Sequence, residues 1–141
     1  MPYEELRRQG RIREHPANLR EIQRLLVLAA RDLRVADANL AIDPDWAYTM
    51  AYNAVLQASR AFMFSQGYRP REAEGHATVV RFMREAMGTE HAARVDQLDQ
   101  MRRKRHRTLY ETAGLVGDRE ARRSLAFAKE FVELLSLRIK R

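Results

Sequence analysis

The sequence predicts an all-α protein, folded as an up-and-down bundle of four to five helices. Long stretches lack glycine and proline, and their apolar residues recur at helical spacing rather than at alternate positions. With 141 residues, of which 45% are hydrophobic, the chain is expected to form one domain, residues 1–141, around a single core. The expected helices span 17–43, 45–66, 76–87, 89–113 and 118–141, after an N-terminal arm of residues 1–16.

The first expected helix, residues 17–43, has apolar residues at alternating intervals of three and four. This is the a/d pattern of a helix that packs against another helix. The stripe consists of Leu19, Ile22, Leu26, Ala29, Leu33, Ala36 and Leu40.

The second expected helix, residues 45–66, begins after Asp43 and Pro44, an N-cap residue and a proline suited to the first turn. Small residues along one side would let a neighbouring backbone approach closely. They are Ala47, Ala51, Ala54, Ala58, Ala61 and Ser65. Large apolar residues occupy the other flanks, so we expect this helix to be central. They are Trp46, Met50, Val55, Phe62 and Met63.

Glycines bound the third and fourth expected helices, and the last one, residues 118–141, has a further apolar stripe. The stripe consists of Leu125, Ala128, Val132, Leu135 and Ile139, reinforced by Phe127 and Phe131. The connections between helices are short, which favours antiparallel neighbours.

Composition excludes several classes of site. The sequence contains no cysteine, so disulfides, thiolate zinc sites, iron–sulfur clusters and cysteine nucleophiles are excluded. The first residues are charged and the longest apolar run is only Leu25 to Ala30, so we expect no signal peptide and no membrane span. We therefore expect a cytoplasmic protein.

Four histidines are present, and their spacing fits no metal or di-iron motif. Phosphate-loop, dinucleotide-binding and serine-hydrolase motifs are also absent, so we expect neither metal nor cofactor. We interpret His15, His76 and His91 as surface or helix-end residues. His106 differs from these three because it lies within a basic block.

Most of the net charge of +7 comes from residues 102–107, which contain five Lys or Arg residues and no acidic residue. A polyanionic partner is therefore a hypothesis about this block. At about 100° per residue, Arg102 and Arg105 project onto the same face as the apolar Val95, Leu98 and Leu109. His106 and Tyr110 project to one edge of that face, whereas Arg103, Lys104 and Arg107 project toward solvent.

A guanidinium on a packing face needs an acidic partner, a subunit interface or a cleft that admits an anion. Asp96 and Asp99 are candidate partners within the same helix. If the arginines face a cleft instead, an acidic or phosphate-bearing ligand is expected there.

The chain resembles the HEPN superfamily, the higher eukaryotes and prokaryotes nucleotide-binding domains, and in particular its small prokaryotic members. Three segments show the likeness: residues 45–54 (DWAYTMAYNA), residues 67–70 (GYRP) with 75–78 (GHAT), and residues 103–111 (RKRHRTLYE). Their order and spacing fit nearly the whole chain, including the arm from Leu6 to Arg13.

The resemblance implies an arginine, often followed by a polar residue, and a histidine after four to six residues, meeting across a homodimer cleft to cleave RNA without metal. Arg105 matches the arginine and His106 the polar residue, while Tyr110 stands in place of the histidine of an Arg-x4-His motif. Because tyrosine has an ordinary pKa of about 10 and histidine of about 6.5, tyrosine is the poorer base at neutral pH.

Three functions remain open. The first is binding of RNA or a nucleotide by Arg102, Arg103, Arg105 and Arg107, with little or no cleavage and with Tyr110 stacking on a base. The second is a metal-independent endoribonuclease in which His106 acts as acid or base and Arg105 stabilises the phosphate. The third is a protein-interaction bundle without nucleic acid. The resemblance also implies a homodimer and a toxin–antitoxin-like pairing with a nucleotidyltransferase partner.

Overall fold

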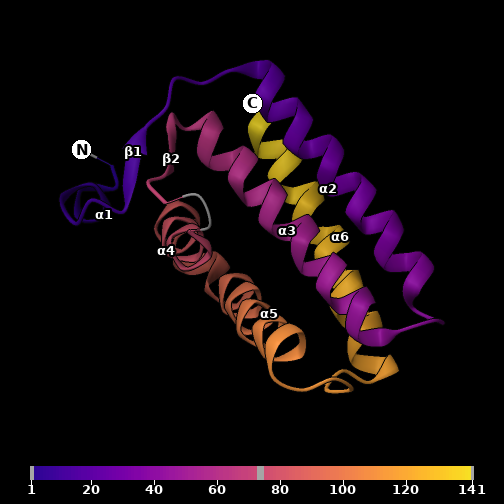
Figure 1. Ribbon diagram of the computed structural model, residues 1–141. Coiled ribbons are helices and arrows are strands. Elements are labelled where there is room, and N and C mark those ends of the chain that lie inside the picture. The colour runs from indigo at the N-terminus through magenta and orange to yellow at the C-terminus, as the bar shows by residue number, and fades with distance from the viewer. Residues whose placement is uncertain (1, 73–74, 141) are drawn as a thin grey trace.

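The computed structural model of the protein describes residues 2–72 and 75–140, and it confirms the all-α bundle (Figure 1). Met1 of the expected arm and Arg141 of the last expected helix lie outside the described residues. The main helices are α2 (Leu19–Asn39), α3 (Pro44–Ser65), α4 (His76–Met87), α5 (Ala92–Tyr110) and α6 (Asp118–Lys140). In the described chain, no helix has an apolar stretch long enough to cross a membrane.

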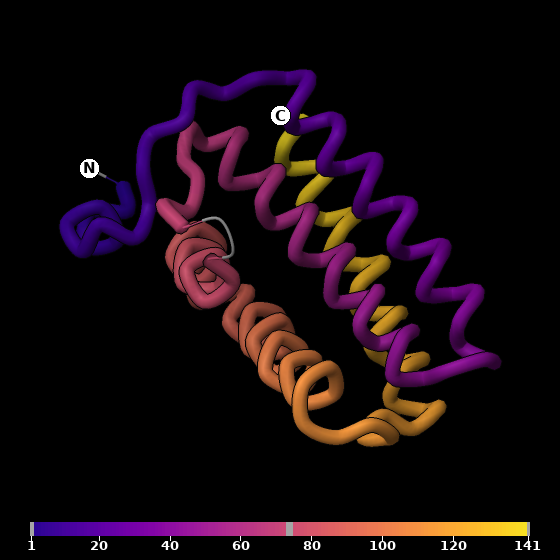
Figure 2. The backbone as a smooth tube through the Cα atoms, in the orientation of Figure 1, coloured from indigo at the N-terminus to yellow at the C-terminus, as the bar shows by residue number. Residues whose placement is uncertain are grey.

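The central helix is α3, as its sequence predicts. Figures 1 and 2 show α2 and α6 alongside it, with α4 and α5 on another side, and α2, α3, α5 and α6 alternate in direction. The alanines of the predicted small-residue stripe have no exposed surface, which lets neighbouring helices approach the α3 backbone; they are Ala47, Ala51, Ala54, Ala58 and Ala61. Trp46 departs from the expectation of a covered flank, since it is 50% exposed.

The a/d stripe predicted for α2 is confirmed at Ile22, Ala29 and Ala36, which are buried, and is wrong at Leu19, which is 67% exposed. Leu19 is the first residue of α2, and its side chain faces solvent rather than a neighbouring helix. Periodicity identifies the face of a helix but not how far along its length a neighbour covers that face.

The N-terminal arm contains structure that the sequence does not predict. It forms helix α1 (Glu4–Arg8) and strand β1 (Ile12–Glu14), and β1 pairs in antiparallel fashion with strand β2 (Tyr68–Pro70). Strands of three residues are too short to show a period-2 pattern, so only the folded chain reveals the pairing. The ring of Tyr3 stacks on that of Phe82 in α4, with centroids 4.1 Å apart, and fixes the arm to the bundle.

Helix α5 positions most of the predicted site residues. Its buried residues Val95, Leu98 and Met101 attach its first three turns to the core. Leu109 is 37% exposed, which corrects the expectation that it lies on the packing face. Because α5 ends at Tyr110, its last turns extend beyond the part of the helix that the core covers.

Candidate nucleic-acid interface

Residues from α4 and α5 line a pocket of about 270 Å³. We call it the Arg105 pocket; its lining residues are His76, Arg102, Arg105, His106 and Tyr110. The structure thus brings together four of the residues that the sequence singles out, and it adds His76.

Arg105 is the most distinctive of these residues. Its guanidinium carbon lies 5.7 Å from the centroid of the Tyr52 ring, a cation–π arrangement. Its Nε is buried and has no hydrogen-bond partner, and no carboxylate of the described residues forms an ion pair with it. A buried polar atom without a partner is costly, so this guanidinium has unused capacity to bind an anion.

Arg102 differs because it has an acidic partner. Its Nε lies 2.9 Å from Oδ1 of Asp99, one turn earlier in α5, so of the alternatives open for this arginine the structure shows an acidic partner. The other candidate acid, Asp96, instead accepts a hydrogen bond from Arg84 of α4 at 2.9 Å. The pocket therefore holds one arginine that shares Asp99 with Arg103 and, within the described part of the chain, one arginine that pairs with no carboxylate.

His76 begins α4, which fits the interpretation of it as a helix-end residue, but its place in the pocket is not predicted from sequence. Its Nδ1 lies 2.9 Å from the hydroxyl oxygen of Tyr52. Burial raises the pKa of Tyr52 well above its ordinary value, although the nearby Arg105 and Arg102 favour the ionised form. The Tyr52 hydroxyl therefore stays protonated near neutral pH and can donate to His76. The sequence signal that could have pointed to His76 as a pocket residue is its position in the HEPN-like segment at residues 75–78.

His106 and Tyr110 form the exposed rim of the pocket. They lie one helical turn apart, with ring centroids 4.8 Å apart and planes inclined by 47°. Tyr110 is 67% exposed, so much of its ring is accessible to a ligand. Aromatic rings with this exposure can stack on unpaired bases.

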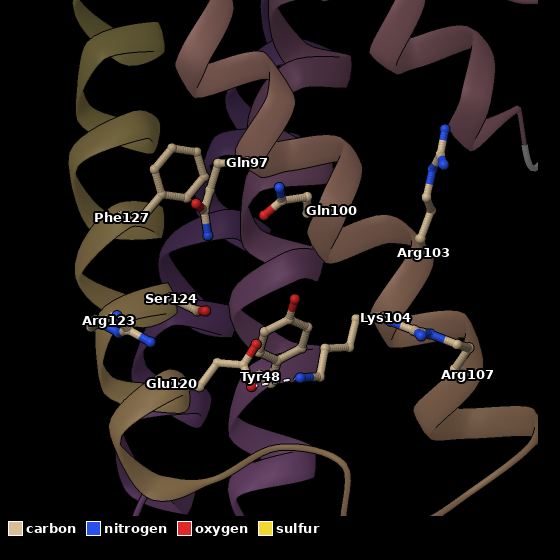
Figure 3. Close-up of a pocket in the computed structure, with 10 residues that line it drawn as sticks. All are labelled: Tyr48, Gln97, Gln100, Arg103, Lys104, Arg107, Glu120, Arg123, Ser124 and Phe127. Atoms are coloured by element: carbon tan, nitrogen blue, oxygen red, sulfur yellow. Dashed lines mark hydrogen bonds and ion pairs between the residues drawn. The ribbon is translucent and has the colours of Figure 1, made fainter.

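The remaining basic residues lie on another face of α5. Arg103, Lys104 and Arg107 line a cavity between α5 and α6 (Figure 3). The solvent-facing expectation for Lys104 is wrong, because its Nζ pairs with Oε1 of Glu120 at 2.6 Å and its side chain is 22% exposed. Arg103 is 70% exposed and contacts Asp99 at 3.1 Å. A helical projection cannot show that α6 lies opposite this face.

The family model for the HEPN domain matches residues 22–139. The chain belongs to the HEPN domain family. This finding confirms the resemblance, and with it membership of a family of nucleotide-binding, ribonuclease-like domains. A comparison with curated proteins found no significant match.

Metal ligands are not grouped in the described part of this HEPN domain, where no three His, Asp or Glu side chains are placed to share an ion. The Arg105 pocket instead contains cations, imidazoles and an exposed phenol. Guanidinium groups bind phosphate, imidazoles exchange protons near neutral pH, and an exposed ring stacks on a base.

Proposed function

We propose that this HEPN domain binds RNA or a nucleotide in the Arg105 pocket and cleaves RNA weakly or not at all. The main support is the guanidinium of Arg105, which has a buried Nε without a partner and no ion pair with a carboxylate of the described residues. A phosphate oxygen would satisfy this donor through a charge-assisted hydrogen bond. Arg102 adds positive charge, and the exposed ring of Tyr110 supplies a surface for a base.

Weak catalysis follows from the identity of residue 110. The family motif implies a histidine there, and Tyr110 lacks a group that exchanges protons readily at neutral pH. The Nδ1 of His76 already contacts the Tyr52 hydroxyl, so this ring nitrogen is occupied within the protein. A pocket of this composition favours binding over cleavage.

A metal-independent endoribonuclease is the second candidate, and two histidines lining one pocket favour it. In that reaction a histidine removes the proton of the ribose 2′-hydroxyl, and the 2′-oxygen attacks the phosphorus. The 5′-oxygen then leaves with a proton from an acid, while Arg105 stabilises the phosphate charge. His106 is the nearer candidate base because it adjoins Arg105 in α5.

We also propose that the domain forms a homodimer through the end of α5. Trp46 and Leu109 line one shallow pocket, and they are 50% and 37% exposed. Exposed apolar residues grouped in this way are typical of interaction surfaces. The family resemblance supports a homodimer cleft here, and it also supports a nucleotidyltransferase partner in a toxin–antitoxin-like module.

A bundle that binds only protein is the third candidate, favoured by the pairing of Arg102 with Asp99.

RNA binding and cleavage measured together test the proposed function. Fluorescence anisotropy with a labelled single-stranded RNA, in EDTA, should show binding by the wild type and a loss of about tenfold or more for Arg105→Ala. Arg24→Ala is the matched control, because Arg24 is an exposed arginine of α2 outside the pocket. Equal losses in the two variants would exclude the Arg105 pocket, and rapid RNA cleavage by the wild type would favour the endoribonuclease.

A further inference from the structure

A second cavity, of about 490 Å³, lies between α5 and α6, with α3 behind it (Figure 3). It shares no lining residue with the Arg105 pocket. Its volume is within the usual range of sites for small molecules, roughly 300–1,000 Å³. We call it the α5–α6 cavity.

Positive charge dominates one end of the α5–α6 cavity. Lys104 and Arg107 of α5 and Arg123 of α6 line it, together with one carboxylate, Glu120, which Lys104 already neutralises. Among the described residues, no carboxylate forms an ion pair with Arg107 or Arg123. A concave surface with cations in excess raises the local concentration of anions, and guanidinium groups bind phosphate oxygens in pairs.

Tyr48 provides an independent indication of a ligand. Tyr48 is only 2% exposed and lines the cavity, and no described residue forms a hydrogen bond with its hydroxyl. In Figure 3 the ring extends from α3 into the space between α5 and α6. Burial, with a smaller contribution from Glu120, raises the pKa of Tyr48, so the hydroxyl remains protonated and can donate a hydrogen bond. A phenolic hydroxyl that lines a cavity in this state is suited to donate to an anionic oxygen.

The opposite end of the cavity has a different chemistry. Figure 3 shows Gln97 and Phe127 together at that end, away from Lys104 and Glu120. The glutamine amide can both donate and accept hydrogen bonds, and the phenyl ring offers a flat apolar surface. This combination fits a planar heterocycle with hydrogen-bonding edges.

We propose that the α5–α6 cavity is a second ligand site, which binds a small phosphate ester bearing a planar polar ring, the chemistry of a mononucleotide. The phosphate lies against Arg107, Arg123 and the hydroxyl of Tyr48, and the ring lies against Phe127. This site is separate from the Arg105 pocket, because the two cavities have no described lining residue in common.

Calorimetric titration with AMP, adenosine and inorganic phosphate tests this proposal. The wild type should bind AMP more tightly than either fragment, because only AMP reaches both ends of the cavity. Arg123→Ala should weaken AMP binding about tenfold or more, and Tyr48→Phe about two- to tenfold, from loss of a charged and a neutral hydrogen bond. Arg122→Ala is the matched control, because Arg122 is exposed and pairs with Asp118 outside the cavity.

Two further comparisons separate this site from the Arg105 pocket. Arg105→Ala should retain AMP binding, and Tyr48→Phe should retain RNA binding, with circular dichroism showing that each variant is folded. The proposal is overturned if the wild type does not bind AMP, or if adenosine binds as tightly as AMP. It is also overturned if AMP binding is lost in Arg105→Ala and retained in Arg123→Ala, since the nucleotide would then occupy the Arg105 pocket.

Discussion

The hydroxyl oxygen of Tyr52 lies 2.9 Å from Nδ1 of His76, and this contact joins the central helix α3 to the first residue of α4. The same Tyr52 ring lies 5.7 Å from the guanidinium carbon of Arg105. The buried Tyr52 side chain therefore contacts a residue from each of the two helices that line the Arg105 pocket, α4 and α5. The geometry of the pocket depends on a residue that is not itself accessible.

The pH dependence of stability should reveal the two buried phenols. The pKa values of Tyr48 and Tyr52 are raised in the folded protein, whereas in the unfolded chain both ionise near pH 10. Above about pH 10 the unfolded state therefore binds fewer protons than the folded state, and the free energy of unfolding decreases as pH rises. The contribution of these two tyrosines to the free energy of unfolding is fully present below about pH 10. It is lost progressively as the pH rises toward their raised pKa values.

Urea unfolding at increasing alkaline pH measures this effect. Tyr52→Phe should reduce the alkaline loss of stability, while costing about 0.5–1.5 kcal/mol near neutral pH because the bond to His76 is lost. Tyr110→Phe is the control, since Tyr110 is 67% exposed. If the free energy of unfolding falls equally steeply with alkaline pH in Tyr52→Phe and in the wild type, this account is wrong.

Replacing the tyrosine at the motif position should increase cleavage of RNA. General acid or base groups contribute about 10²–10⁴-fold to rates, so Tyr110→His should cleave labelled RNA in EDTA faster than the wild type. Arg105→Ala in the same background should abolish the gain, because the phosphate loses its guanidinium partner.

His106→Ala provides the complementary comparison. If the wild type cleaves RNA well and His106→Ala does not, then His106 is the working base and the preference for binding over cleavage is wrong. Absence of cleavage in all of these proteins leaves binding as the function of the pocket.

The exposed basic residues of α5 should add to RNA affinity through the phosphates. We expect Arg103→Ala and Arg107→Ala each to weaken RNA binding modestly and without sequence preference. Each phosphate contact that is lost should reduce the slope of log affinity against log salt concentration by about 0.7 for single-stranded RNA. An unchanged salt slope in the double variant would remove Arg103 and Arg107 from the RNA-binding surface.

The proposed homodimer should depend on the apolar end of α5. Light scattering at micromolar concentration should give twice the monomer mass for the wild type and a monomer for Leu109→Glu, because a carboxylate would be buried at the interface. Leu137→Glu is the control, since Leu137 is 55% exposed on α6. A monomeric wild type would exclude the homodimer.

Residues with strong local constraints were predictable from sequence. Asp43 caps α3, with its side chain accepting from the backbone nitrogen of Asp45, and Ala51 and Ala58 face the core. The different surroundings of Arg102 and Arg105, the two arginines of the packing face, were only partly predictable. Asp99 lies within one turn of Arg102, whereas the ring of Tyr52 comes from another helix.

The sequence by itself determined the helices, the central position of α3 and the HEPN family, because helical periodicity, capping residues and motif spacing are local properties of the chain. Only the tertiary structure decided that His76 joins Arg105, that Glu120 neutralises Lys104, and that β1 pairs with β2. These contacts join residues of separate elements, and their geometry follows from how the helices pack. Local periodicity predicts which face of a helix is buried, but it does not predict which side chain of a neighbouring element lies opposite that face.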